Sequence, residues 1–202
     1  MPRARALGRT DGAMLRIVEN PSAPPGKSEK YARVERERRW LLAGPPAPAD
    51  ATAAVVITDH YLAGTRLRLR RSVDQRDREP TIYKLTQKVP VAGRQQGLIT
   101  NVYLTETEYE LLRRLGGDRL VKTRYRVPPF GIDVFDPPLV GLVLAEVEFA
   151  SDGEADAATA PASACREVTD DERFTGGRLA RTSRAQLAAL LAETKSVRSR
   201  RG

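Results

Sequence analysis

The clearest pattern in this sequence is a repeated alternation of hydrophobic and polar residues between about residue 34 and residue 150. A period of two places successive side chains on opposite faces of a β-strand, so each alternating run predicts one strand. The runs number about eight and their connections are short, which favours an antiparallel barrel or sandwich over a parallel sheet. The candidate strands are 34–42, 55–62, 65–72, 81–89, 98–104, 120–127, 131–135 and 141–150.

Two segments with a longer period predict helices. Thr105 and Glu108 have the spacing of a capping box, and the leucines after them share one helical face until Gly116 ends it. Residues 183–193 form the second candidate helix. Its buried face is expected to carry Leu187, Leu190 and Leu191. The expected fold class is therefore α+β, mainly β, with a few flanking helices.

Stretches rich in proline, glycine or small residues divide the chain. Proline fixes the backbone and removes a donor, so the proline-rich stretch 44–50 predicts a loop. Residues 151–163 are small and acidic, which predicts an exposed insertion. The basic segments 1–30 and 195–202 lack hydrophobic periodicity and are interpreted as tails on one domain, 31–194.

The charge balance points to an anionic partner. Lys and Arg total 34 against 26 Asp and Glu, which gives a net charge of +8. Such a protein attracts nucleic acids, phosphorylated metabolites and acidic membranes. Aromatic residues make up 5% of the chain, which leaves little stacking surface for single-stranded nucleic acid and disfavours that partner.

Cysteine and histidine are too scarce for two common kinds of site. Cys165 has no second cysteine to pair with, and together with the single histidine, His60, it provides too few ligands for zinc. His60 is interpreted as structural, and Cys165 is placed in a loop without a role. No long apolar run is present, which predicts neither a signal peptide nor a membrane span and favours a cytoplasmic protein.

Charged residues occupy alternate positions on five of the candidate strands. On the first, Glu35, Glu37 and Arg39 share one face, so two carboxylates converge. The matching acidic pair near the end of the sheet is Glu146 and Glu148. The strands between carry basic side chains: Arg66, Arg68, Arg70, Lys84, Lys88, Lys122 and Arg124.

Two interpretations of these stripes are open at this point. A half-buried antiparallel strand normally turns its charges toward water, and for any single stripe this is the better interpretation. The five together favour the interior of a closed barrel. Like charges about 4 Å apart repel by about 4 kcal/mol at an effective dielectric near 20, so such an interior needs counter-charges. Carboxylates and a bound polyanion would supply them.

The opening stripe also matches a known motif. Glu35-Arg36-Glu37-Arg38-Arg39 resembles the Glu-x-Glu-x-Lys opening of the CYTH domain, also called the triphosphate tunnel metalloenzyme family. Later stripes resemble those of the family in the same order, and the resemblance spans about residues 31–180. They are Leu67-Arg68-Leu69-Arg70, Lys84-Leu85-Thr86-Gln87-Lys88, Lys122-Thr123-Arg124-Tyr125, Gly131-Ile132-Asp133 and Ala145-Glu146-Val147-Glu148-Phe149.

The resemblance implies an eight-stranded antiparallel β-barrel, a triphosphate tunnel, with Mg²⁺ or Mn²⁺ bound by glutamates. It implies hydrolysis of inorganic triphosphate or of a triphosphate-containing organic substrate. The implied metal ligands are Glu35, Glu37, Glu146 and Glu148. The implied substrate-binding residues are Arg68, Arg70, Lys84, Lys88, Lys122 and Arg124. Glu35, Glu37, Arg39 and Asp133 are the implied catalytic residues, of which Asp133 is equally plausible as a turn residue.

Two departures from the family pattern bear on the chemistry. Arg39 stands where the motif usually has lysine, and a guanidinium does not readily give up its proton, which leaves Arg39 an electrostatic role. Many members carry an Arg-x-Glu-x-Glu strand, whereas residues 99–103 have no charge. The metal is therefore expected to rest on fewer carboxylates.

Two other functions remain open beside hydrolysis. The same phosphate clamp serves adenylate cyclases, in which the ribose hydroxyl of ATP is the nucleophile. A non-catalytic polyphosphate-binding module would use the basic groups alone, although the carboxylate pairs favour catalysis. Fold resemblance does not choose among these functions. The sequence also leaves the oligomeric state open.

Overall fold

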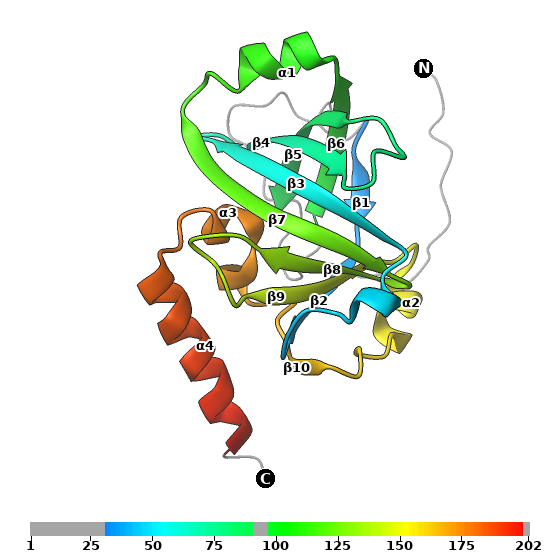
Figure 1. Ribbon diagram of the computed structural model, residues 1–202, viewed down its shortest axis with the longest axis vertical. Coiled ribbons are helices and arrows are strands. Elements are labelled where there is room, and N and C mark those ends of the chain that lie inside the picture. Colours follow the sequence, from blue (N-terminus) through cyan, green and yellow to red (C-terminus); the bar gives the residue numbers. More distant parts are fainter. Residues whose placement is uncertain (1–30, 91–96, 200–202) are drawn as a thin grey trace, which may run out of the picture.

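The computed structural model describes residues 31–90 and 97–199, and within them the fold is one mainly β unit with few helices (Figure 1). A single ten-stranded antiparallel sheet carries most of these residues. Its strands are β1 (Arg33–Glu35), β2 (Glu37–Leu42), β3 (Ala53–Leu62), β4 (Leu67–Asp74), β5 (Ile82–Pro90), β6 (Gly97–Leu104), β7 (Gly117–Val127), β8 (Phe130–Phe135), β9 (Val143–Glu148) and β10 (Ala164–Glu167).

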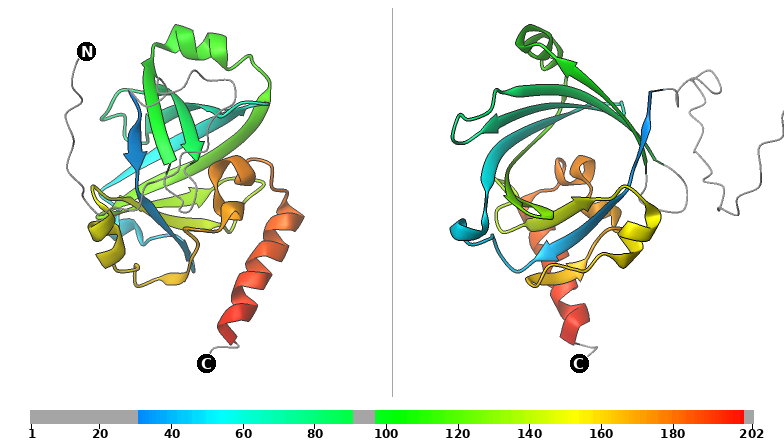
Figure 2. Two further views of the ribbon diagram at one scale, coloured as in Figure 1. Left: turned by 180° about the vertical axis from the view of Figure 1, so that it is seen from behind. Right: turned by 90° about the vertical axis from the view of Figure 1, so that its right-hand side faces the viewer.

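The order of the strands brings the two edges of the sheet near each other. The order is β1-β6-β5-β4-β3-β7-β8-β9-β2-β10. β1 and β2 are separated by Arg36 alone, yet β1 pairs with β6 while β2 pairs with β9. Figure 2 shows the sheet curled round, with β1 running from its upper part toward β2 in its lower part. Residues on one face of distant strands are therefore brought near one another.

The strands predicted from alternation, about eight, are confirmed, but the described sheet has ten, because the first is divided and β10 was not predicted. The first predicted strand, 34–42, is divided at Arg36 into β1 and β2. The placement of Cys165 in a loop is wrong, because this residue lies in β10, which pairs with β2. β10 is only four residues long and has a register shift between Ala164 and Arg166, so it lacks the sustained alternation that identified the other strands.

The predicted helix at Thr105 is confirmed as α1 (Glu106–Leu112). The Thr105 side chain accepts from the backbone N–H of Glu108, and the Glu108 carboxylate accepts from the backbone N–H of Thr105. The second predicted helix is confirmed as α4 (Arg184–Ser199), which extends past the predicted end at residue 193. The remaining helical segments are η1 (Pro48–Asp50), α2 (Asp152–Ala157), η2 (Glu172–Phe174) and α3 (Gly176–Leu179). The predicted tail 1–30 and residues 200–202 lie outside the described residues.

Helices α3 and α4 pack against one end of the sheet. Leu187 of α4 and Leu179 of α3 share a buried cluster with Leu144 of β9 and Phe174 of η2. The Tyr61 ring reaches the same cluster and lies against Gly176, where a Cβ atom would stand only 1.9 Å from the tyrosine hydroxyl. A second cluster, around Trp40, covers the opposite face of β2. None of the described helices is long and apolar enough to cross a membrane.

We expect Gly117→Ala to destabilise the fold by about 1–3 kcal/mol, because a Cβ atom at this position would lie 2.2 Å from the Tyr61 carbonyl oxygen. Backbone atoms of paired strands cannot move apart without breaking the β3–β7 pairing. The matched control is Gly116→Ala, since nothing lies within 4 Å of the added atom there. Chemical denaturation of both variants measures the difference, and equal stabilities would contradict the close packing of β3 on β7.

Candidate active site

One face of the curled sheet carries most of the predicted site residues. Alternation along each strand brings every second side chain to this face, and the pairing registers align them between strands, as in Arg39 opposite Glu146 and Arg70 opposite Lys84. We call this surface the charged face. Its charged residues are Glu35, Glu37, Arg39, Asp59, Arg68, Arg70, Lys84, Lys88, Lys122, Arg124, Asp133, Glu146 and Glu148.

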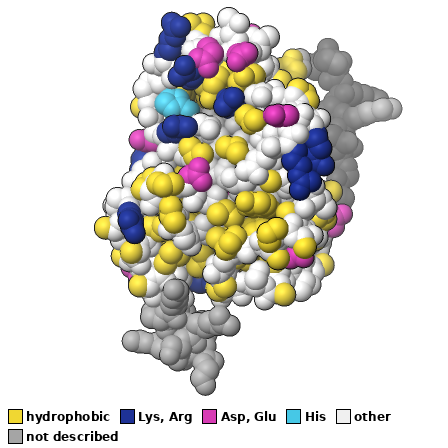
Figure 3. Space-filling model, viewed as in Figure 1, with side chains coloured by type: hydrophobic (Ala, Val, Ile, Leu, Met, Phe, Trp, Pro, Cys, Tyr) yellow, Lys and Arg dark blue, Asp and Glu magenta, His cyan; other side chains and the backbone are white. Residues whose placement is uncertain are grey.

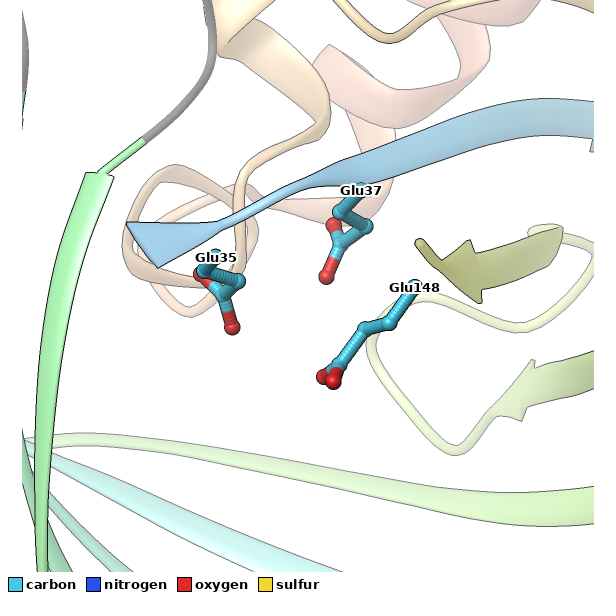
Figure 4. A group of neighbouring side chains, drawn as sticks. All are labelled: Glu35, Glu37 and Glu148. Carbon is cyan, nitrogen blue, oxygen red and sulfur yellow. The ribbon is translucent and has the colours of Figure 1, made fainter. Parts of the chain in front are cut away.

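Three carboxylates converge at one place on the charged face. Glu35 ends β1, Glu37 begins β2 and Glu148 ends β9, and one oxygen from each lies within 4.8 Å of the others. Figure 4 shows the three side chains pointing toward a common space. Burial raises the pKa of Glu37, and the nearby Glu146 carboxylate raises it further. This group of oxygen donors has the chemistry that Mg²⁺ and Mn²⁺ prefer.

Glu146 is not part of that group, although the family resemblance implied that it binds metal. Its carboxylate instead accepts from Arg39 Nε at 2.8 Å and from Arg124 Nη2. Burial alone would raise the pKa of Glu146, but Lys122, Arg39 and Arg124 outweigh burial and hold this pKa well below its usual range. Glu146 is therefore a buried counter-charge for guanidinium groups.

Arg39 joins carboxylates on two neighbouring strands. Its Nε donates to Glu146, its Nη2 donates to Glu37, and its Nη1 donates to the Phe174 carbonyl oxygen at 3.3 Å. The side chain is buried, with 8% of its surface exposed. Its three separate contacts use the planar fork of donors that arginine offers and lysine lacks.

Asp133 is fully buried and is bound by two cations. Its two carboxylate oxygens accept from Arg124 Nε at 2.6 Å and Nη2 at 2.7 Å, and Lys122 Nζ also donates to it. A bidentate pair of this kind fixes the guanidinium in one orientation. Asp133 therefore positions Lys122 and Arg124 on the charged face, and it does not join the three-carboxylate group.

Asp59 is a further site residue that the sequence interpretation missed. It is 1% exposed and accepts from Arg70 Nε at 2.6 Å and Nη2 at 2.7 Å, while Arg68 Nε lies 3.5 Å away. Burial would raise the pKa of Asp59, but Arg70 and Arg68 together hold this pKa well below its usual range. The sequence contained a signal for this residue, because Asp59 shares its strand face with the hydrophobic residues Ile57 and Tyr61. A carboxylate on a hydrophobic face needs a partner of opposite charge if it is buried.

Two basic side chains of the charged face keep donors free among the described residues. Lys84 Nζ forms no ion pair there, and burial together with Arg70 and Arg68 lowers the pKa of this amine to about 8. Arg68 Nε is buried and has no hydrogen-bond partner. Lys88, by contrast, donates to Glu35. The free donors of Lys84 and Arg68 lie on neighbouring strands, opposite Tyr103 and Thr86 respectively.

The inner positions of β6 are uncharged, as the sequence predicts. Asn101 accepts from the Thr86 hydroxyl at 2.8 Å, and Ile99 is buried. His60 lies on the other face of the sheet, where its Nε2 is 2.8 Å from the Leu115 carbonyl oxygen, in accordance with a structural role.

Comparison with known proteins identifies relatives of this chain. The chain is 33% identical over 156 residues to an inorganic triphosphatase of Nitrosomonas europaea, a match that covers 72% of this chain and 96% of the relative. The chain belongs to the CYTH, or triphosphate tunnel metalloenzyme, family. No family model matches it.

Two solved structures are also similar to this CYTH protein. The inorganic triphosphatase NE1496 is 29% identical with a TM-score of 0.48, over 73% of this chain and 95% of that one. A structure described as the hypothetical protein NE1496 is 30% identical with a TM-score of 0.49, over 74% and 99%. In the present CYTH protein, the opening motif of the family occupies β1 and β2, and its later acidic motif occupies β9.

The Asp59 pair gives a prediction about pH. Because the pKa of Asp59 is lowered on folding, its contribution to stability is complete above the unfolded value of 3.8 and is lost as the pH falls toward the folded value. We expect Asp59→Asn to lower the free energy of unfolding by about 3–5 kcal/mol at pH 7 and to flatten its dependence on pH below 4. Denaturant titrations between pH 2 and pH 7 measure both effects. The exposed Asp170→Asn is the control, and parallel curves for wild type and Asp59→Asn would disprove the assignment.

Proposed function

We propose that this protein hydrolyses a linear triphosphate, with a divalent cation held by Glu35, Glu37 and Glu148. The observation that carries the proposal is that the unpaired Lys84 ammonium, surrounded by further basic groups, and a convergent carboxylate group share one face of the sheet. An anion-binding module would need only the first of these. The relative named as an inorganic triphosphatase supports the same reaction.

The substrate would lie in a closed tunnel. β1 and β2 act as one bent strand, in which β1 pairs with β6 and β2 pairs with β9. The sheet would therefore close on itself. Closure of the remaining strands around this bent strand gives the eight-stranded barrel of the family. The charged face then becomes the interior, and α3 and α4 cover one end. A tunnel would exclude part of the water that competes for phosphate oxygens.

The carboxylate group fits a hard divalent cation. Its three oxygens lie within 4.8 Å of one another, and Lys88 and Arg39 each pair with one of its members, which offsets only part of their repulsion. When bound, Mg²⁺ or Mn²⁺ would supply positive charge to phosphate oxygens and orient the attacking water. Glu146 would keep Arg39 and Arg124 in place without binding the cation.

The basic residues would bind and align the phosphates. Lys84 offers the first contact, because it forms no ion pair among the described residues, whereas Arg68 Nε is buried 3.5 Å from an Asp59 oxygen and the other cations hold carboxylates. Arg70, Lys88, Lys122 and Arg124 would add positive charge around the chain of phosphates. Phosphoryl transfer depends mainly on this alignment and neutralisation, and a chain of three phosphates would contact several such groups at once.

Tyr103 favours an organic triphosphate as a second class of substrate. It is 73% exposed and lies directly across from Lys84 on the charged face. An exposed aromatic ring beside the free ammonium offers a surface on which a planar group could stack. Inorganic triphosphate would then use the basic residues alone, and an organic ester would also contact Tyr103.

The deciding experiment incubates the protein with tripolyphosphate, ATP or thiamine triphosphate in the presence of Mg²⁺ or Mn²⁺. We expect release of orthophosphate that stops with excess chelator. Formation of cyclic AMP from ATP would instead establish the cyclase reaction. Binding of all three compounds without turnover would leave a polyphosphate-binding module and exclude the proposed hydrolysis.

We expect Glu148→Gln to weaken Mn²⁺ binding by about 10- to 100-fold and to leave the fold intact, since this carboxylate is exposed and has no basic partner among the described residues. Electron paramagnetic resonance of free Mn²⁺ measures the affinity, and thermal unfolding checks the fold. Glu172→Gln, at an exposed carboxylate of η2, is the matched control. Equal affinities for the two variants would exclude Glu148 as a ligand.

We expect the affinity for tripolyphosphate to fall between pH 7 and pH 9 in part because Lys84, whose pKa is about 8, loses its charge in this range. Lys84→Arg keeps the charge at both pH values, since an arginine does not titrate there. The ratio of the two Michaelis constants, variant over wild type, should therefore decrease by several-fold as the pH rises. A ratio that does not depend on pH would show that Lys84 does not contact the anion.

A further inference from the structure

A cavity of about 530 Å³ lies outside the charged face, between α1 and the outer surface of β3, β4 and β7. Thr58 and His60 of β3 line it, and they alternate along the strand with Asp59, which points the other way. Arg71 of β4 likewise alternates with Arg70. The cavity is therefore separate from the proposed tunnel, although the two share strands. We call it the outer groove.

Three guanidinium groups surround the outer groove. Arg71 comes from β4, Arg113 follows α1, and Arg119 comes from β7. All three lie close enough to the Tyr109 hydroxyl to influence its ionisation. Three separate elements thus direct positive charge toward one space, and a volume of about 530 Å³ is in the usual range for small-molecule sites.

The acidic residues of the outer groove do not neutralise all of this charge. Glu110 is bound by Arg113, and Glu106 accepts from the Tyr83 hydroxyl at 3.1 Å. Arg71 and Arg119 have no carboxylate within ion-pair distance among the described residues. Figure 3 shows basic side chains directly above and below the single histidine on this surface. His60 Nε2 donates to the Leu115 carbonyl oxygen, which leaves Nδ1 available to a ligand.

We propose that the outer groove binds a small phosphorylated anion through Arg71 and Arg119. Guanidinium groups bind phosphate oxygens with paired donors, and two of them on one cavity wall suit a dianion. The Tyr109 hydroxyl provides a neutral donor beside them, whereas His60 Nδ1, unprotonated in this tautomer, can only accept a hydrogen bond. The cavity is larger than orthophosphate alone requires, so an organic phosphate monoester fits it better than the free ion. This proposal does not depend on the reaction in the tunnel.

The test is a titration of ¹⁵N-labelled protein, with chelator present and the ionic strength held constant with chloride. The probes are orthophosphate and adenosine monophosphate, which separate recognition of the phosphate group from recognition of an organic part. We expect the amide signals of Thr58, Gly117 and Arg119 to shift with saturation. Signals of Thr86 and Arg124 report any binding in the tunnel separately.

The decisive variant is Arg71→Gln with Arg119→Gln, which we expect to weaken binding at the outer groove at least tenfold. The control replaces Arg76 and Arg114, two exposed arginines that do not line the cavity, with glutamine. Loss of binding in the first variant but not in the second supports the proposal. Equal binding by both variants, or shifts at Thr58 and Gly117 that chloride alone reproduces, would overturn it. A variant that unfolds is replaced by Arg71→Lys with Arg119→Lys, for which we expect several-fold weaker binding.

Discussion

Charge balance on one face of the sheet is the constraint on which the rest of this structure depends. The face carries seven basic side chains, and like charges held this close repel strongly when water is excluded. Buried acids offset the repulsion: Asp59 binds Arg70, Asp133 binds Arg124 and Lys122, and Glu146 binds Arg39 and Arg124. Asp59, Asp133 and Glu146 each bind a base on the neighbouring strand, so these pairs also fix the register of the sheet, while the pair of Glu146 and Arg124 spans β8.

This arrangement divides the carboxylates into two kinds. Asp59, Asp133 and Glu146 are paired with guanidinium and ammonium groups. These cations stabilise the ionised carboxylates and thereby lower the pKa of Asp59 and Glu146. Glu35, Glu37 and Glu148 face a common space, where burial raises the pKa of Glu37. A site for an added cation arises only where acids outnumber bases locally. The proposed metal site and the buried pairs are therefore two outcomes of one distribution of charge.

Alternation was sufficient to predict the strands from 53 to 148, because a period of two is imposed by the backbone itself. It could predict which charges share a face, and Glu35, Glu37 and Arg39 do so. It could not predict which partner each charge takes, since that depends on the register between strands distant in sequence. For this reason the sequence did not predict that Glu146 pairs with Arg39 and Arg124, and Asp59, a single acid in an apolar row, went unnoticed.

The arginine at the last position of the opening motif, Arg39, fits the same charge balance. A lysine there would present one point charge on a flexible stem, whereas the Arg39 fork contacts Glu37, Glu146 and the Phe174 carbonyl at once. One side chain thereby joins the three-carboxylate group, a buried acid and the segment that leads into α3. Because a guanidinium stays protonated, Arg39 contributes fixed charge and geometry and no proton. Any proton transfer in the reaction must then involve water or another side chain of the charged face.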